Sequence, residues 1–542
     1  MAVDDRKLTG GPSPPAHDKE SSLAPFRYPA FAVLWIATVI SNIGTWMQSA
    51  AAGWLMTDLD PHPLIVSLVQ VAASLPMFIL AIPAGALADT VDRRRLIIVI
   101  QIAVTVLGLA FAFLVRLGSV TPDLLLGFMV LAATAAALIM PVWQSIVPQL
   151  VSRELLQPAV ALNSAGVNVS RAVGPALAGL IIAAWGMDAP YWVNALSNIA
   201  VIAALLWWRP PDAGVVRNLP SERFLLAIGA GLRYARYNPH LRATQIHALG
   251  FYVFASAYWA LLPLVARNQI AGGPELYGIL LGAIGVGAVG GAFALPFLKR
   301  HLGPDRLVAA GVLGTAFALL LFAFARQSST ALVASVLAGV SWIAVLATLN
   351  VSAQVALPNW VRGRGLSIFN TVMFGSLTLG SAIWGKVAAL AGLPAAHVIA
   401  ALGALIAVPL LWGWKLQTGS TLDLTPSMHW PEPVVISDDI ESDRGPVLIT
   451  VEYQIRPEDS DDFLKAMTEL AGERRRDGAF AWNIFEDLAQ KGRFVETFML
   501  ASWLEHLRQH ERVTDADRNL QESVDRFQIN GVPKVTHLIA AL

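Results

Sequence analysis

Long apolar stretches separated by short polar breaks fill the chain from Pro29 to Leu416. A helix rises about 1.5 Å per residue, so it needs about 20 apolar residues to cross the hydrocarbon core of a bilayer. Twelve stretches reach that length, at 29–56, 63–88, 96–117, 122–147, 158–185, 190–208, 243–266, 275–298, 305–325, 329–356, 364–388 and 394–416. The pattern predicts an all-α polytopic membrane protein with twelve transmembrane helices.

The segment 209–242 divides these stretches into two sets of six, which predicts an N-terminal half over 29–208 and a C-terminal half over 243–416. The halves echo each other, since Asn163 and Gly174 follow Pro148 much as Asn370 and Gly380 follow Pro358. Repeated six-helix halves are the build of many secondary transporters, whose substrate site lies between the halves.

Positive charges fall in alternate breaks. One set of breaks, which includes 209–242, holds fifteen Lys and Arg residues, whereas the other set holds four. Because cytoplasmic loops retain Lys and Arg, we expect 209–242 and both ends of the chain in the cytoplasm.

The two ends differ from the apolar region in composition. Residues 1–28 are rich in Pro and mixed in charge, which predicts a disordered cytoplasmic tail. Residues 417–444 have the composition of a linker. In 445–542, alternating and helical patterns predict strand, helix, two strands, one or two helices and a last strand, at 446–455, 459–475, 479–487, 494–501, 503–527 and 533–540. This β-α-β-β-α-β order predicts a small α+β ferredoxin-like domain.

Composition narrows the functional classes. Hydrophobic residues make up 55% of the chain and charged residues 14%, where soluble domains hold about 25% charged residues. The 38 basic residues balance the 38 acidic ones, so no net positive charge favours nucleic acid. The chain has no cysteine, which excludes thiolate chemistry and Cys-ligated metal centres. We expect no cofactor.

The most specific motif lies at the end of the second stretch, where Gly85 and Asp89 precede Arg93, Arg94 and Arg95. A simple basic stop at a helix end is the alternative interpretation. With twelve spans in two halves, this motif resembles the major facilitator superfamily over residues 29–416. Segments 42–48, 141–144 and 161–175 resemble its branch of bacterial enterobactin exporters.

The resemblance implies a transporter in a bacterial inner (cytoplasmic) membrane that exports a small molecule, a siderophore or an amphipathic drug-like compound, by alternating access. Its partners would be the lipid bilayer and this substrate, with the proton gradient as energy source. Gly85, Asp89 and the three arginines would form an inner gate. However, no Asp or Glu lies deep in any span. Span four, at 122–147, also lacks the arginine of proton-driven drug antiporters.

Arg171 lies midway along the fifth span, where a charge in lipid is costly and marks a functional candidate. It either faces the substrate cavity and favours an anionic group, or bonds carbonyls as a structural arginine. The adjacent Gly174-Pro175 resembles an exporter motif and is expected to let the helix bend. Gln48, Gln144 and Asn350 are expected in the cavity as well, although a helix–helix hydrogen bond is the commoner role of such residues.

The C-terminal segment resembles antibiotic-biosynthesis-monooxygenase-like domains, which commonly pair into dimers. His506 and His510 have the spacing of metal ligands on a helix, but no third ligand lies nearby in the sequence, so no metal site is expected. The sequence thus indicates an exporter with an accessory domain. The alternatives are a membrane-anchored enzyme or a sensor acting through this domain.

Overall fold

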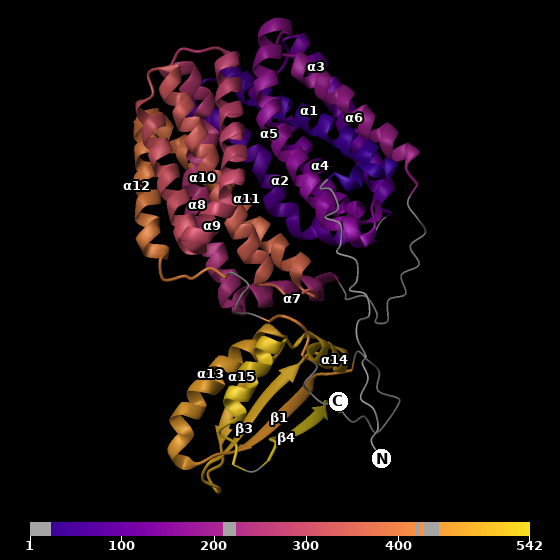
Figure 1. The fold of residues 1–542 in the computed structure, drawn as a ribbon, viewed down its shortest axis with the longest axis vertical. Coiled ribbons are helices and arrows are strands. Elements are labelled where there is room, and N and C mark those ends of the chain that lie inside the picture. Colours follow the sequence, from indigo (N-terminus) through magenta and orange to yellow (C-terminus); the bar gives the residue numbers. More distant parts are fainter. Residues whose placement is uncertain are drawn as a thin grey trace, which may run out of the picture.

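A helical bundle and a small α+β domain make up the computed structural model, which describes residues 23–90, 92–209, 224–417, 423–427, 444–529 and 531–541 (Figure 1). The N-terminal half contains α1 (Pro29–Leu59), α2 (Pro63–Thr90), α3 (Arg93–Arg116), α4 (Pro122–Ile146), α5 (Leu156–Trp185) and α6 (Ala189–Trp207). The C-terminal half contains α8 (Pro239–Leu264), α9 (Pro274–Phe324), α10 (Ser328–Val355), α11 (Arg362–Ala391) and α12 (Leu393–Leu411).

Eleven of these helices are long and apolar enough to span a membrane, and one of them holds two spans. Helix α9 is 51 residues long and leaves helical geometry at Gly303, whose φ is +69°. Glycine tolerates this left-handed conformation, and Pro304 after it has no backbone N–H to continue the ladder. The break falls between the expected spans 275–298 and 305–325. The prediction of twelve spans in two halves is therefore confirmed.

The outer surface of the bundle is apolar. Phe293 is 84% exposed, Leu390 76% and Leu410 71%. Large apolar side chains in such number are costly in water but suit the acyl chains of a bilayer. The surface therefore agrees with a protein embedded in a membrane.

Polar contacts join the two halves at the end of the bundle away from the C-terminal domain, which we name the far end. The opposite end is the domain end. Arg267, just after α8, donates to Thr57 at 2.9 Å and pairs with Asp58, both at the far end of α1. Nearer the middle, the hydroxyls of Ser74 on α2 and Thr378 on α11 are 2.7 Å apart. The far end is thus held closed by polar contacts between the halves.

The C-terminal domain has the predicted order of elements. It consists of β1 (Val447–Gln454), α13 (Ser460–Arg476), β2 (Phe480–Glu486), β3 (Arg493–Leu500), α14 (Trp503–Arg512), α15 (Asp515–Asp525) and β4 (Lys534–Ile539). The sheet is antiparallel in the order β2-β3-β1-β4. Alternate β1 residues, from Val447 to Tyr453, are buried against the helices. This arrangement fits the expected ferredoxin-like domain.

Segment 209–242, expected as a loop, contains the helix α7 (Phe224–Tyr237), onto which the C-terminal domain docks. The guanidinium of Arg476 lies 5.3 Å from the Tyr234 ring. Arg233 pairs with Glu505 at 3.9 Å. Arg512 lies 4.5 Å from the ring of Trp360, which precedes α11. The domain therefore contacts both the connection between the halves and the C-terminal half.

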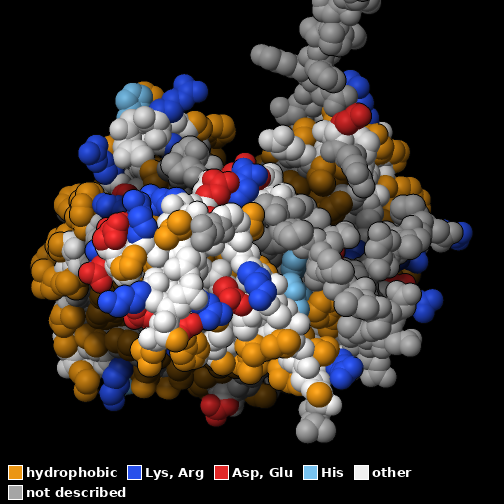
Figure 2. Space-filling view, turned by 90° about the horizontal axis from the view of Figure 1, so that it is seen from below, with side chains coloured by type: hydrophobic (Ala, Val, Ile, Leu, Met, Phe, Trp, Pro, Cys, Tyr) orange, Lys and Arg blue, Asp and Glu red, His pale blue; other side chains and the backbone are white. Residues whose placement is uncertain are grey.

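Charge at this interface is balanced locally. Burial alone would raise the pKa of the Glu505 carboxyl, but Arg512, Arg508 and Arg233 outweigh burial and lower it. Seen from the domain end, acidic and basic side chains lie intermixed over the docked domain, and hydrophobic side chains show along the rim of the bundle (Figure 2). The docked domain thus carries charges of both signs, in contrast to the apolar outer surface of the bundle.

Candidate functional site between the halves

Arg171 lies on α5 where the two halves face each other. Its guanidinium carbon is 5.1 Å from the centroid of the Trp46 ring on α1. Tyr252 and Tyr258 of α8, in the other half, lie within electrostatic range of it. The site therefore combines a cation and an indole from the N-terminal half with two phenols from the C-terminal half.

Among the described residues, the guanidinium has fewer hydrogen-bond partners than a structural arginine requires. Its Nε and Nη1 are buried and make no hydrogen bond within the described part of the chain. None of the described Asp and Glu residues forms an ion pair with it. A buried donor without a partner costs about 1–3 kcal/mol, and more when it is charged. This favours the cavity interpretation of Arg171 over the structural one.

An aromatic wall continues the site into the C-terminal half. The Tyr252 ring lies 5.2 Å from the Trp342 ring on α10, and Trp342 lies 5.4 Å from Trp259. The Tyr252 hydroxyl and the Trp342 Nε1 are also buried without a hydrogen-bond partner among the described residues. Several donors beside flat apolar rings can bind an aromatic ligand that carries anionic or acceptor oxygens.

The sequence did not single out Tyr252, Tyr258 or Trp342. Aromatic residues are frequent in membrane helices, and a helix-end belt is their usual role. What distinguishes Tyr252 and Tyr258 is their position near a charge more than 80 residues away in the chain, and Trp342 is distinguished by its ring contact with Tyr252. The signal in the sequence was a charged residue within the otherwise apolar fifth span. That signal identified Arg171 but none of the aromatic residues in the other half.

The three other expected cavity residues do not hydrogen-bond to Arg171. Gln48 is buried and its Oε1 accepts from Asn194 of α6 at 2.6 Å, which is a helix–helix bond inside the N-terminal half. Asn350 donates to the carbonyl of Leu346 on its own helix at 3.0 Å. The side chain of Gln144 is exposed. We therefore centre the candidate site on Arg171 and the aromatic residues.

The expected gate motif lies at the domain end of the N-terminal half. Helix α2 continues to Thr90 and includes Gly85 and Asp89, but the surroundings of these two residues lie outside the described part of the structure. Arg94 donates to the carbonyls of Leu205 and Leu206 at 2.7 and 2.8 Å and so caps the end of α6.

All three arginines of the motif lie in the first turn of α3, which begins at Arg93. The backbone N–H of Arg95 donates to Asp92, whose carboxylate caps this helix. Arg94 thus caps α6 and Asp92 caps α3, and the part of the three arginines in a gate stays a prediction.

Gly174 and Pro175 let α5 pass closely between its neighbours. A Cβ on Gly174 would lie 2.6 Å from the Trp46 Cβ and 2.8 Å from the Ile43 carbonyl oxygen. A Cβ on Gly278 of α9 would lie 2.6 Å from the Pro175 carbonyl oxygen. Helix α5 is continuous through Pro175. The pair therefore serves tight packing in this structure, and bending stays a prediction.

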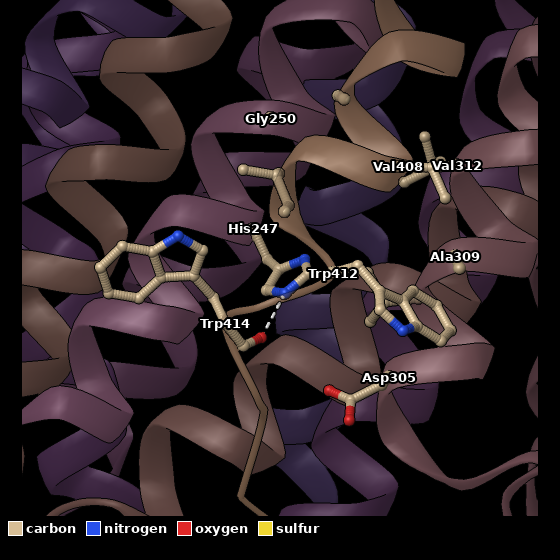
Figure 3. A pocket seen from close by; sticks show the side chains of 11 residues that line it. His247, Gly250, Asp305, Ala309, Val312, Val408, Trp412 and Trp414 are labelled. Carbon is tan, nitrogen blue, oxygen red and sulfur yellow. Dashed lines mark hydrogen bonds between the residues drawn. The ribbon is translucent and has the colours of Figure 1, made fainter.

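A separate hollow lies at the domain end of the C-terminal half (Figure 3). His247 points to the chain leaving α12, where its Nε2 lies 2.8 Å from the Trp414 carbonyl oxygen. On the same segment, the Leu416 N–H donates to Asp305 at 2.9 Å. These contacts fasten the exit of the chain toward the C-terminal domain, so the hollow is accounted for without a substrate.

A family model covers both the bundle and the domain, and several known proteins match about two thirds of the chain. The sequence model of a family described as transmembrane secretion effector matches residues 20–541. The multidrug efflux pump Tap of Mycolicibacterium fortuitum is 26% identical over 393 residues, which are 70% of this chain and 94% of that protein. The enterobactin exporter EntS of Shigella boydii is 25% identical over 374 residues, 67% of this chain and 86% of EntS.

Two further similarities have lower coverage or identity. The staphyloferrin A transporter of Staphylococcus aureus is 23% identical over 48% of this chain and 65% of that protein. Among solved structures, an inward-facing bacterial homologue of the human lysosomal transporter Spinster aligns with a TM-score of 0.57 at 16% identity, over 72% of this chain and 96% of that one. The structural match shows a shared fold.

Proposed function

The chain belongs to the transmembrane secretion effector family of major facilitator superfamily transporters, and we propose that it exports an anionic, aromatic small molecule across the bacterial inner membrane. It is a membrane transporter and not an enzyme. The observation that carries the substrate class is the Arg171 guanidinium, which lies over the Trp46 ring and within electrostatic range of Tyr252 and Tyr258. Its Nε and Nη1 have no hydrogen-bond partner among the described residues. A carboxylate or phenolate of the substrate would take the place of the missing partner.

Siderophores fit this chemistry because they carry many anionic and acceptor oxygens, often on aromatic rings. Two of the similar proteins are named for siderophores and one for multidrug efflux. The aromatic wall also suits amphipathic drug-like compounds, since flat rings stack on indole and phenol faces. We therefore place siderophores first and aromatic drugs second as substrates.

The transport cycle proposed here is alternating access with the site between the halves. The closed far end would be the outer side of the membrane, so that the domain end and both ends of the chain lie in the cytoplasm. The charge bias of the breaks supports this orientation. Substrate would enter from the cytoplasm, and rocking of the halves would open the far end. The proton gradient would supply the energy.

Efflux from loaded cells tests this function. Bacteria without their own exporters would carry the full chain, and efflux of catecholate siderophores and amphipathic dyes would be followed with and without a proton uncoupler. We expect uncoupler-sensitive extrusion of at least one anionic aromatic compound. No extrusion of any compound, despite membrane-inserted protein, would contradict the proposal and favour a sensor that binds without flux.

Removal of the C-terminal domain separates a transporter from a tethered enzyme. A chain ending at Arg444 should keep measurable efflux, because all twelve spans and the Arg171 site lie before that residue. Its rate should fall, since the contacts of Arg476 and Arg512 with the bundle are lost. Complete loss of function in a truncated protein that reaches the membrane would favour an activity residing in the domain.

We further propose that a second copy of the chain pairs through the open face of the sheet. The registers place Phe480, Met499, Leu448 and Leu538 in one row across all four strands, on the face away from the helices. Phe485 lies on the same face and is 55% exposed. Exposed apolar rows of this kind mark interaction sites.

The dimer prediction is checked by the mass of the protein in detergent. Phe485→Glu should shift the population toward monomer, because a charge would be buried in the interface. Leu488→Glu is the matched control, since Leu488 is 99% exposed in the turn between β2 and β3. An equal mass for the wild type and Phe485→Glu would contradict pairing through this face.

A further inference from the structure

Three histidines from separate parts of the sequence gather on the C-terminal domain. His506 and His510 lie one turn apart on α14, and His537 lies on β4. One nitrogen of each ring lies within 4.8 Å of the other two. The register explains the third member: His537 pairs with Ile449, whose buried side chain faces the helices, so His537 points to that face as well.

His506 lacks the partners that a buried imidazole normally finds. It is 2% exposed, and neither ring nitrogen meets the geometry of a hydrogen bond within the described residues, although the buried Gln509 amide is beside it. Buried polar side-chain atoms are usually hydrogen-bonded, so an orphan calls for an explanation. Its ring lies 4.7 Å from both the His510 and the His537 rings, at interplanar angles of 89° and 48°.

These observations lead us to propose that His506, His510 and His537 hold one divalent transition-metal ion of the zinc type. Neutral imidazole is a preferred ligand of Zn²⁺, and three histidines leave a fourth position for water or another ligand. Tetrahedral bonds of about 2.1 Å place ligand nitrogens about 3.4 Å apart. Small side-chain rotations would therefore bring the three nitrogens into ligand positions.

The surroundings suit such a site. The Trp503 ring lies 5.2 Å from the His506 ring and 6.3 Å from the His537 ring, which gives the cluster an apolar wall. His510 and His537 are half-buried, so an ion can enter from solvent. The acidic cluster of Glu473, Asp477 and Asp517 differs, because Arg476 already binds the two aspartates at 2.8 Å.

Zinc binding by the full chain tests the proposal. The tag-free protein in detergent would be dialysed against Zn²⁺ at fixed free concentrations, and bound metal measured by elemental analysis. We expect about one Zn²⁺ per chain in the wild type. Loss of a residue that only hydrogen-bonds to a metal ligand typically weakens metal binding about 10- to 100-fold. His510→Gln and His537→Gln should each weaken zinc binding by more than this, because each removes a ligand itself. His301→Gln, on α9 and outside the domain, is the matched control and should bind as the wild type does.

A spectrum of the wild type gives a result that does not depend on the folding of any variant. Co²⁺ in the site should show the visible d–d absorption of a tetrahedral, nitrogen-ligated ion, and Zn²⁺ should displace it. Absence of this absorption, or equal zinc binding by the wild type and both glutamine variants, would overturn the proposal. Efflux is not a readout here, so failure of the transport proposal would leave this test intact.

Discussion

Replacing Arg171 with alanine is expected to nearly abolish export while the protein remains folded in the membrane. A hydrogen bond to a charged group contributes about 1.5–3 kcal/mol, which corresponds to about 10- to 150-fold in transport at low substrate concentration. The substitution also removes two buried donors that have no hydrogen-bond partner among the described residues, so little folding energy should be lost with them. Initial efflux rates at equal membrane content measure the effect.

Two variants make this result specific. Arg171→Lys keeps the positive charge but not the planar fork, so it should retain more transport than Arg171→Ala. Arg326→Ala removes an exposed arginine between α9 and α10 and should transport as the wild type does. Equal loss of folded protein in Arg171→Ala and Arg171→Lys would show instead that this arginine is structural.

Gly278→Ala is expected to have the second largest effect. A Cβ at this position of α9 would lie 2.6 Å from the Pro175 carbonyl oxygen and 3.0 Å from the Gly179 Cα. Both are backbone atoms of α5, so the helices must separate to admit the methyl group. The far end then cannot close as it does in this structure, and the transport rate should fall at least about tenfold, which corresponds to about 1.4 kcal/mol.

The same helix provides the control for this prediction. Gly290 lies on α9 too, but a Cβ there would meet no atom within 4 Å. Gly290→Ala should therefore transport normally. Accessibility of a single cysteine introduced at the far end, probed from outside, should rise in Gly278→Ala and stay low in Gly290→Ala. Low accessibility together with normal transport in Gly278→Ala would contradict a close α5–α9 contact at the far end.

Local patterns were enough to predict most of the fold. Span length and apolar composition identified all twelve spans, including the two joined within α9, because polar residues separate the apolar stretches 275–298 and 305–325. Strand alternation and helical spacing also predicted the β-α-β-β-α-β order of the domain. These features depend on residues close together in the sequence, which is why they can be read without a structure.

The candidate sites depend on contacts between distant residues and were predicted only in part. Arg171 was found because a charge in an apolar span is unusual, but Tyr252, which lies near it, and Trp342, which packs on Tyr252, carry no such signal. His506 and His510 had metal-ligand spacing, whereas His537 comes from another element and joins them through strand register. For Gln48, the sequence suggested a cavity residue. The structure shows instead that its amide oxygen accepts a hydrogen bond from Asn194.

The docking of the domain was also beyond sequence reasoning. Segment 209–242 has the length and charge of a loop, and the amphipathic helix α7 within it becomes evident once Tyr234 and Arg476 are seen in contact. The contact of Arg512 with Trp360 links residues more than 150 positions apart. Such interfaces follow from three-dimensional complementarity and leave no periodic pattern.

The most direct test of the central claim is uptake into inside-out membrane vesicles that contain the full chain. A catecholate siderophore with free carboxylate or phenolate groups and its neutral, methylated analogue would be compared under an imposed proton gradient, with Arg171→Ala as a parallel sample. We predict gradient-dependent uptake of the anionic compound by the wild type, with little uptake of the neutral analogue and little by Arg171→Ala. Equal uptake of both compounds, or uptake unchanged in Arg171→Ala, would contradict an anion-binding site at Arg171.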